Sequence, residues 1–243
     1  MRVSRIQRFS TEDGPGIRST VFFQGCNLAC LWCHNPETRP KEPPAAEGQT
    51  AGMSVREVMD ILLEDMPFYL ESGGGVTLSG GEPLLQPSAC KGLAEACKAE
   101  GLHVIIDTAG DVPFEHFYML LSCTDCFYYD LKTADPFDCS HYTGGNFTNI
   151  IENLGRLTEY GAQVRVRIPV IPGLSDHIDY LKGIRALGLT AGVDVDQMDL
   201  LPFHRMGSGK YIRMGLSYAY EKVEPVSEQK IKELRRAFYE RES

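Results

Sequence analysis

The sequence predicts an α/β fold, specifically an incomplete (β/α)6 barrel of the TIM type. Short runs rich in Val, Ile, Phe and Tyr alternate along the chain with longer amphipathic stretches, which is the pattern of strands and helices in turn. Such alternation indicates a parallel sheet joined by right-handed crossovers. Polar or glycine-containing motifs also follow the ends of the apolar runs, where barrel enzymes carry their active sites.

The expected elements follow in chain order. The apolar runs predict strands at 19–24, 75–79, 103–107, 126–131, 163–170 and 196–201. The amphipathic stretches predict helices at 54–66, 88–100, 114–121, 148–160, 176–187 and 227–241. Ser54 and Glu57 have the spacing of a capping box, and Ser227 is a candidate N-cap of the last helix. Residues 36–52 are rich in Pro, Gly and Ala and are expected to form a loop.

Length and charge exclude several classes of protein. A chain of 243 residues with 43% hydrophobic content can bury a large core, so we expect a single domain over residues 1–243. The formal net charge of −9 and the lack of a basic tract argue against nucleic-acid binding. No apolar leader follows Met1, and no apolar run is long enough to span a bilayer. We therefore expect a cytoplasmic monomer with no nucleic-acid or membrane partner.

Cys26, Cys30 and Cys33 form a compact triad directly after the strand expected at 19–24. Four thiolates usually hold a 4Fe–4S cluster, so a triad with no fourth cysteine nearby predicts a cluster with one iron open to another ligand. The alternative is a zinc site in which His34 supplies the fourth ligand. Zinc ligands usually come in two separated pairs, and neighbours such as Cys33 and His34 seldom reach one ion, so the spacing favours a cluster.

The other five cysteines show no framework spacing, and eight cysteines in all fit a reducing compartment better than a disulfide scaffold. Cys90 and Cys97 lie seven residues apart in a predicted helix, which is typical of core residues. Cys123 and Cys126 have the spacing of half a metal site or of a redox pair. They lack a partner pair, which favours a structural role, and no role is assigned to Cys139.

Polar residues gather after the predicted strands. They are Ser79, Gly80, Gly81 and Glu82 after the second strand, Asp107 and Thr108 at the end of the third, Asp130 and Lys132 after the fourth, Arg167 in the fifth, and His204 after the sixth. Each alone has an ordinary explanation, since glycine pairs form turns and aspartates cap helices. Their placement at the same end of a parallel sheet favours one shared site.

Taken in order, these motifs resemble those of the radical S-adenosylmethionine (SAM) superfamily, and in particular the glycyl radical enzyme activating enzymes. The resemblance covers nearly the whole chain. It is carried by the cysteine triad with Trp32, His34 and Asn35, and by Asp13-Gly14-Pro15-Gly16-Ile17-Arg18, Ser72 to Thr77 with Ser79 to Glu82, Asp107 to Gly110, Tyr129 to Lys132, Arg167-Ile168-Pro169 and Leu201 to His204. Several matches in the same order are far more specific than any one of them.

The resemblance implies an enzyme that reductively cleaves SAM and removes a hydrogen atom from a glycine Cα of a partner, a glycyl radical enzyme. It implies one 4Fe–4S cluster on Cys26, Cys30 and Cys33. A hydrogen atom moves rather than a proton, so no acid or base catalyst is expected. Flavodoxin or a ferredoxin is the expected electron donor, because clusters of this type work at low potential.

The resemblance also assigns roles to residues around SAM. Trp32 would pack on the adenine, and His34 would join the cofactor-binding residues. Ser79, Gly80, Gly81 and Glu82 would bind the methionine amino group, while Lys132, Arg167 and His204 would hold the carboxylate and the ribose hydroxyls. Asp107, Thr108 and Asp130 would hold a monovalent cation beside SAM. The loop of Asp13, Gly14, Pro15, Gly16 and Arg18 would grip the glycine-bearing loop of the partner.

The chain departs from many such relatives in one respect. Residues 34–89 contain no cysteine, so an inserted ferredoxin-like domain is not expected, as in the activating enzyme of pyruvate formate-lyase. Pro67-Phe68-Tyr69 and the segment 167–173 are more similar to the insert-bearing relatives, so the identity of the partner stays open. Two alternatives remain, namely a radical SAM enzyme with a small-molecule substrate and a non-catalytic zinc-binding module.

Overall fold

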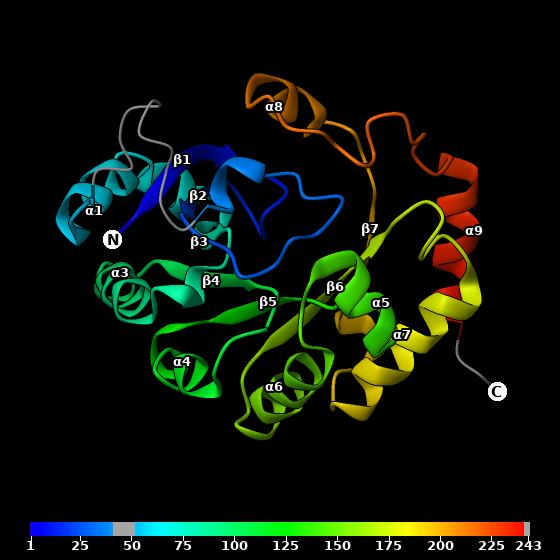
Figure 1. The fold of residues 1–243 in the computed structure, drawn as a ribbon. Helices are drawn as coiled ribbons and strands as arrows, with labels where there is room; N and C mark the ends of the chain where they lie inside the picture. The colour runs from blue at the N-terminus through cyan, green and yellow to red at the C-terminus, as the bar shows by residue number, and fades with distance from the viewer. Residues whose placement is uncertain (41–51, 241–243) are drawn as a thin grey trace. The chain divides into compact units, whose positions relative to one another are not determined.

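The computed structural model describes residues 1–40 and 52–240 (Figure 1). Within these residues the chain forms a seven-stranded sheet in the order β1-β2-β3-β4-β5-β6-β7, so each strand neighbours the next one in the chain. β1 runs antiparallel to β2, whereas β2–β3, β3–β4 and β6–β7 are parallel pairs. The predicted open α/β sheet is confirmed.

Six strands match the predicted ones. They are β2 Arg18–Phe23, β3 Gly75–Gly80, β4 His103–Thr108, β5 Cys126–Asp130, β6 Val164–Val170 and β7 Met198–Pro202. Most residues of β2, β3 and β4 are buried, as in a parallel sheet covered by helices, whereas buried and half-buried residues alternate in β5 and β6. β2, for example, is buried along its whole length.

The strand β1, Val3–Ser10, is absent from the sequence-based prediction. Its inner residues are largely polar, and only Val3 and Ser10 at its two ends are buried, so the run lacks a clear apolar period. Its pairing with β2 extends from Val3 opposite Phe23 to Ser10 opposite Arg18, with two register shifts. β1 therefore forms a strand because it pairs with the strongly apolar β2, although its own sequence pattern is weak.

The structure divides into two compact units, each with its own dense set of internal contacts. The first comprises residues 1–27, 37–108 and 112–128, and the second comprises residues 28–36, 109–111 and 129 onward. The prediction of a single domain stays a prediction. The first unit contains α1 Val55–Leu63, α2 Met66–Ser72, α3 Pro87–Ala99 and α4 Phe114–Tyr118, with the short helices η1 Pro36–Thr38, η2 Pro83–Leu85 and η3 Leu121–Cys123.

The helix predicted at 54–66 is two helices. α1 begins at the expected capping box of Ser54 and Glu57. Asp65 follows it, and the buried carboxylate of Asp65 accepts hydrogen bonds from Arg8 Nε at 2.8 Å and Ser19 Oγ at 3.0 Å. Pro67 then lies in the first turn of α2, where the missing N–H is tolerated. The break thus occurs at the residue that ties this segment to β1 and β2.

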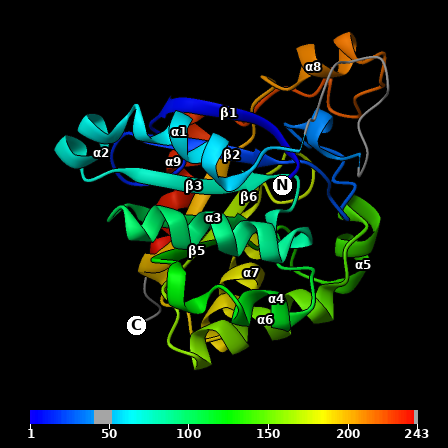
Figure 2. The ribbon, with the colours of Figure 1, turned by 90° about the vertical axis from the view of Figure 1, so that its left-hand side faces the viewer.

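The first unit buries an apolar layer between its strands and helices. Val21, Leu78 and Ile106 alternate with polar residues along β2, β3 and β4 and are fully buried. The helices α1 and α3 pack against one another beside these strands (Figure 2). Cys90 and Cys97 of α3 are also fully buried, which confirms their interpretation as core residues.

The second unit contains the remaining helices. They are α5 Pro136–Asp138, α6 Phe147–Glu159, α7 Ile178–Thr190, α8 Ser208–Arg213 and α9 Glu228–Tyr239, with the one-turn π-helix η4 Cys139–Thr143 and η5 Val195–Gln197. Ser227 caps α9 by accepting a hydrogen bond from the Lys230 N–H, as expected. The helices α5 and α8 are missing from the prediction because each is too short to show an amphipathic period.

Part of the loop predicted at 36–52 is visible. Residues 36–38 form η1, and residues 41–51 lie outside the described residues, as does the last residue of the helix predicted at 227–241.

Among the described helices, none is both long and apolar enough to cross a lipid bilayer.

Gly74 precedes β3, and a Cβ atom there would lie 1.8 Å from the Ile17 carbonyl oxygen. We expect Gly74→Ala to destabilise the protein by about 3 kcal/mol or more, because backbone rather than a flexible side chain must move. Gly92→Ala is the matched control, since a Cβ at this helical position meets only Val55 Cγ2 at 3.6 Å and should stabilise by up to about 1 kcal/mol. Urea midpoints measure both effects, and equal midpoints would contradict the expectation.

Candidate active site

Polar side chains line one face of β2, β3 and β4 in the first unit. Side chains alternate between the two faces of a strand, and Thr20 is in register with Thr77. Ser79, two residues further along β3, therefore lies on the same face as these threonines. Asp107 of β4 joins them, because Ser79 Oγ donates a hydrogen bond of 2.7 Å to Asp107 Oδ2.

The loop from Asp13 to Arg18 lies on this same face. Asp13 Oδ2 accepts hydrogen bonds from Ser10 Oγ and Thr20 Oγ1, each at 2.6 Å, and its carbonyl oxygen accepts one from Thr77 Oγ1 at 2.8 Å. These three hydroxyl contacts are not apparent from the sequence, because nothing in it pairs a threonine of one strand with a threonine of the next. The structure thus brings the loop together with the face that carries Ser79.

Arg18 is fully buried at the start of β2. Its guanidinium donates to Thr77 Oγ1 at 2.9 Å and to the carbonyl oxygens of Val76 at 2.7 Å and His103 at 3.2 Å. Burial lowers the pKa of this guanidinium to about 10. Arg18 therefore anchors the amino ends of β3 and β4. Its guanidinium also holds the loop by donating a hydrogen bond to the Pro15 carbonyl.

The turn after β3 is packed directly against the segment that leads to Cys26. Gly81 N donates to the Phe23 carbonyl at 3.0 Å, and Glu82 N donates to the Gly25 carbonyl at 2.8 Å. A Cβ on Gly80 would lie 2.2 Å from Phe23 N, and one on Gly81 would lie 2.2 Å from the Gly25 carbonyl oxygen. Both glycines are required by this close approach, which sets where the cysteine loop begins.

Glu82 is buried beside this turn, with 1% of its surface exposed. Its carboxylate accepts hydrogen bonds from Thr108 Oγ1 at 2.9 Å and from Leu84 N at 3.1 Å. Glu82 and Asp107 thus place two carboxylates at the carboxyl ends of β3 and β4. This end of the first unit suits a cationic group such as an amine.

In the second unit, Asp130, Lys132 and Arg167 form a partly buried ionic cluster. Asp130 Oδ2 lies 2.5 Å from Lys132 Nζ, and Asp130 Oδ1 lies 3.0 Å from Arg167 Nε. Burial by itself would raise the pKa of Asp130, but the positive charges of Arg167 and Lys132 outweigh it and lower the pKa to about 2. Two cations surround one carboxylate, so the cluster suits a further anionic group.

The residues expected to hold a cation are therefore in different surroundings. Asp107 and Thr108 belong to the first unit, whereas Asp130 belongs to the second, where it is already ion-paired.

The cysteine loop of the second unit runs along η4. Ala29 N donates to the Thr143 carbonyl at 2.7 Å and Leu31 N to the Tyr142 carbonyl at 3.0 Å, while Cys33 N closes a turn onto the Cys30 carbonyl at 3.2 Å. Burial raises the pKa of the Cys30 thiol to about 11. Cys26 belongs to the first unit, and all eight cysteines are free thiols.

Trp32 lies inside an apolar cluster rather than on the surface of this loop. Its side chain is 6% exposed and packs with Tyr142 and Tyr220, each with ring centroids 6.2 Å away. The other buried members of the cluster are Ile171, Leu174, Phe203, Tyr211 and Tyr218. The ring therefore fixes the cysteine loop to residues far along the chain, which the local motif could not reveal.

His34 and His204 stack on one another, with ring centroids 4.0 Å apart and an angle of 21° between the rings. Burial and the nearby charge of His204 lower the pKa of His34 to about 4, and burial lowers that of His204. His34 Nε2 and His204 Nδ1 are buried without a hydrogen-bond partner. Buried polar atoms are normally satisfied, so this neutral pair presents ring nitrogens suited to a ligand hydroxyl or ring.

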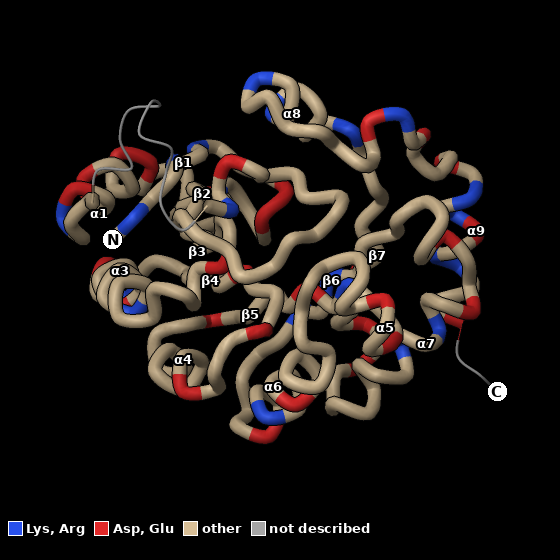
Figure 3. The backbone as a smooth tube through the Cα atoms, viewed as in Figure 1, with Lys and Arg blue, Asp and Glu red and all other residues tan. Residues whose placement is uncertain are grey.

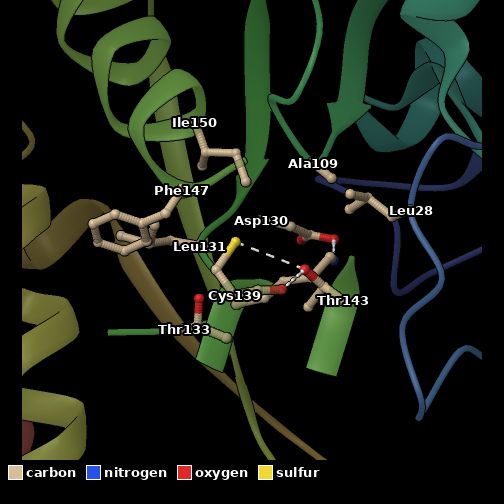
Figure 4. A pocket seen from close by; sticks show the side chains of 10 residues that line it. Leu28, Ala109, Asp130, Leu131, Thr133, Cys139, Thr143, Phe147 and Ile150 are labelled. Carbon is tan, nitrogen blue, oxygen red and sulfur yellow. Dashed lines mark hydrogen bonds and ion pairs between the residues drawn. The ribbon is translucent and has the colours of Figure 1, made fainter. Parts of the chain in front are cut away.

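A small pocket lies beside the ionic cluster in the second unit (Figure 4). Leu28 and Ile150 form apolar walls, and Asp130 and Thr143 supply polar groups. Cys139 lines it as well, with its sulfur 3.7 Å from Thr143 Oγ1. The pocket is therefore lined both by Leu28 of the cysteine loop and by Asp130, the carboxylate that is paired with Lys132.

The donor set fits an iron–sulfur cluster chemically. Three free thiols on one short loop are the soft ligands that such clusters require. The two orphaned imidazole nitrogens fit a ligand that brings hydroxyls and an aromatic ring, as SAM does. Within residues 1–40 and 52–240, no group of three or more His, Cys, Asp or Glu side chains is gathered into a ready metal site.

An open, largely parallel α/β sheet with three free thiols after its second strand defines a class of iron–sulfur enzyme. A model of the radical SAM superfamily matches residues 20–187. A radical SAM methyltransferase from Sphaerobacter thermophilus has a similar fold, with a TM-score of 0.66 at 14% identity over 97% of this chain and 73% of that one. Membership of this superfamily implies a 4Fe–4S cluster and SAM as cofactors.

Curated relatives narrow the class. The trans-4-hydroxy-L-proline dehydratase activating enzyme of Clostridioides difficile is 34% identical over 288 residues, covering 97% of this chain and 95% of the relative. The pyruvate formate-lyase-activating enzyme of Staphylococcus epidermidis is 35% identical over 234 residues, covering 94% of this chain and 91% of the relative. The chain belongs to the glycyl radical enzyme activating enzymes, radical SAM enzymes that act on glycyl radical enzymes. The alternatives of a zinc-binding module and a small-molecule enzyme are not favoured.

The two alignments differ in length. The alignment with the dehydratase activating enzyme covers 288 residues, which is more than the 243 of this chain. That relative therefore carries inserted residues with no counterpart here. The alignment with the pyruvate formate-lyase-activating enzyme, at 234 residues, implies no such insertion.

Asp130 provides a direct test of the ionic cluster. Asp130→Asn removes the carboxylate that Lys132 and Arg167 share, and we expect a loss of about 2 kcal/mol in the free energy of unfolding. Asp179→Asn, at an exposed position of α7, should change it by about 0.5 kcal/mol or less. Anaerobic urea denaturation of the reconstituted protein measures both, and an Asp130→Asn variant as stable as the parent would contradict this role of the Asp130 carboxylate.

Proposed function

We propose that Cys26, Cys30 and Cys33 hold one 4Fe–4S cluster, at which SAM binds and is cleaved to activate a glycyl radical enzyme. The observation that carries the proposal is the triad of free thiols after β2 in a chain of this family. When bound, the cluster supplies the electron that cleaves SAM, so that a hydrogen atom can be taken from a glycine Cα. The residues of the chain hold the cluster, orient SAM and admit the glycine.

The methionine amino group of SAM is assigned to Ser79, Gly80, Gly81 and Glu82. Two carboxylates, Glu82 and Asp107, lie at this end of the first unit and favour a cation. The two glycines hold this turn against Phe23 and Gly25, which fixes the position of the Glu82 carboxylate.

The SAM carboxylate is assigned to Lys132 and Arg167. Asp130 holds both side chains in place, and a guanidinium has five N–H donors, so Arg167 can bind a second carboxylate in addition to Asp130. The ribose hydroxyls are assigned to His34 and His204, whose orphaned nitrogens need a partner. Trp32, a member of the apolar cluster that fixes the cysteine loop, is assigned to pack on the adenine.

A monovalent cation is assigned to Asp107, Thr108 and Asp130. The support is electrostatic, since a cation offsets the negative charge gathered around Asp107 and Glu82. It is proposed to act beside SAM and not as a redox centre.

The glycine-bearing loop of the partner is assigned to Asp13, Gly14, Pro15 and Gly16. Their backbone lies on the face that carries Ser79, and hydroxyls hold Asp13 there. Arg18 positions this loop from beneath through the Pro15 carbonyl. No acid or base catalyst is assigned, because a hydrogen atom is transferred.

We also propose flavodoxin or a ferredoxin as the electron donor, since the cluster must be reduced at low potential. The chain is proposed to act as a cytoplasmic monomer without nucleic-acid or membrane partners, which its net charge of −9 supports.

Anaerobic electron paramagnetic resonance of the reduced, reconstituted protein tests the cluster. We expect a 4Fe–4S signal whose g-values shift when SAM is added, because SAM binds the open iron. Cys30→Ala should abolish the signal and the bound iron, whereas Cys97→Ala, which alters a buried thiol of α3, should retain both. A signal indifferent to SAM, or full iron content in Cys30→Ala, would overturn the assignment.

Two candidate partners test the substrate. Trans-4-hydroxy-L-proline dehydratase and pyruvate formate-lyase are incubated separately with the enzyme, SAM and a reductant, and the glycyl radical is measured by its paramagnetic doublet. We expect a radical in one of them, and Asp13→Ala should reduce its rate of formation about tenfold by loosening the loop. SAM cleavage without a partner is the control and should be unchanged. Failure of both proteins to acquire a radical would contradict the expectation.

A further inference from the structure

The segment around α8 exposes an unusual set of apolar side chains in the second unit. Met206 is 79% exposed, Ile212 68% and Leu216 48%. The same segment buries Tyr211 and Tyr218 on its other side. Its buried tyrosines are therefore fixed by packing, while its exposed apolar side chains do not pack in the core. Exposed apolar residues gathered on one ordered segment are typical of a surface that binds another protein.

The charge of this segment is opposite to that of the whole chain. Residues 200–220 contain Arg205, Lys210 and Arg213 and no Asp or Glu, although the chain has 33 acidic residues and a net charge of −9. Figure 3 shows α8 with basic but no acidic positions. Arg205 pairs with Glu224 at 3.1 Å, while Arg213 has no acidic partner in the described part of the chain. The exposed residues of α8 and its flanking segments are thus both apolar and basic.

This segment is built onto the cysteine loop. Tyr211 OH donates to the Cys33 carbonyl at 3.1 Å, and Lys210 Nζ donates to Asn35 Oδ1 at 2.6 Å. Gly207 packs on the backbone of His34, since a Cβ at Gly207 would lie 3.2 Å from His34 Cα. A protein seated on α8 would therefore lie one layer of residues away from the third cysteine of the triad.

We propose that the exposed face of α8 and its flanking residues, formed by Met206, Ile212, Arg213 and Leu216, docks the acidic one-electron carrier protein that reduces the cluster. This inference rests on the proposed function. One electron passes from the reduced carrier to the cluster, so the carrier is oxidised by one electron and no proton is transferred. The positive charge steers an acidic partner, and the apolar side chains supply the contact area.

Other occupants fit this face less well. A second copy of the chain would bring the same unpaired Arg213 against itself, and like charges at an interface are unfavourable. An electron carrier needs only closeness to the cysteines, which the contacts with Cys33 and Asn35 provide.

The test compares Arg213→Glu and Ile212→Ser with the control Lys232→Glu, which makes the same charge change on an exposed position of α9. Binding of purified flavodoxin is measured by calorimetry at low and high salt, with a ferredoxin as the second probe. SAM cleavage is then measured with reduced flavodoxin and, separately, with dithionite, a small reductant that needs no docking face.

We expect Arg213→Glu to weaken flavodoxin or ferredoxin binding about tenfold and to reduce its salt dependence, because a steering charge is reversed. Ile212→Ser should weaken binding several-fold without changing the salt dependence. Carrier-driven SAM cleavage should fall in parallel, dithionite-driven cleavage should not change, and Lys232→Glu should behave as the parent protein.

Four results would overturn the proposal. Binding unchanged in both variants, or no binding of either carrier to the parent protein, would exclude this face as the docking site. An equal fall in dithionite-driven cleavage would assign α8 to supporting the cysteine loop instead. Loss of glycyl radical formation at saturating dithionite would assign the face to the glycyl radical enzyme. Absence of SAM cleavage with dithionite in the parent protein would instead refute the proposed function itself.

Discussion

The backbone contact between the turn after β3 and the segment after β2 is the constraint on which the candidate site depends. Gly80 and Gly81 approach Phe23 and Gly25 so closely that neither can carry a side chain. This contact fixes the direction in which the chain leaves β2 and therefore where Cys26 lies relative to β3. A motif that resembles a ligand cradle in the sequence is thus also a joint between two strands, and both roles require glycine.

The two units contribute different electrostatic surroundings. The first unit gathers carboxylates, Glu82 and Asp107, at the carboxyl ends of its strands. The second gathers cations, Lys132 and Arg167, around Asp130. The local charge at these positions is therefore negative in the first unit and largely positive in the second. Buried charges elsewhere, such as Arg18 with its carbonyl partners, stabilise the backbone that holds these groups.

The sequence predicts an element when the residues that stabilise it are close to it in the chain. The six strands β2 to β7 and the capping box at Ser54 follow from nearby residues, so they are predicted correctly. β1 and the break at Asp65 depend on partners distant in the chain, and periodicity does not show them.

The same distinction holds at the candidate site. The motifs mark which segments carry Ser79, Asp130 and the cysteines. They do not show that the Trp32 ring is buried among residues 142–220 or that the donors of Arg18 reach the start of β4. Such contacts are decided by topology, which places distant residues side by side.

The edge strand β1 has a further consequence for solubility. β2 is buried along its full length, and β1 covers the hydrogen-bonding edge that β2 would otherwise present. β1 itself is polar, and Arg8 pairs with Glu64 and Asp65 beside it. Charged edge strands resist pairing with strands of other molecules. The weak apolar pattern that hides β1 from prediction is therefore what protects the sheet against aggregation.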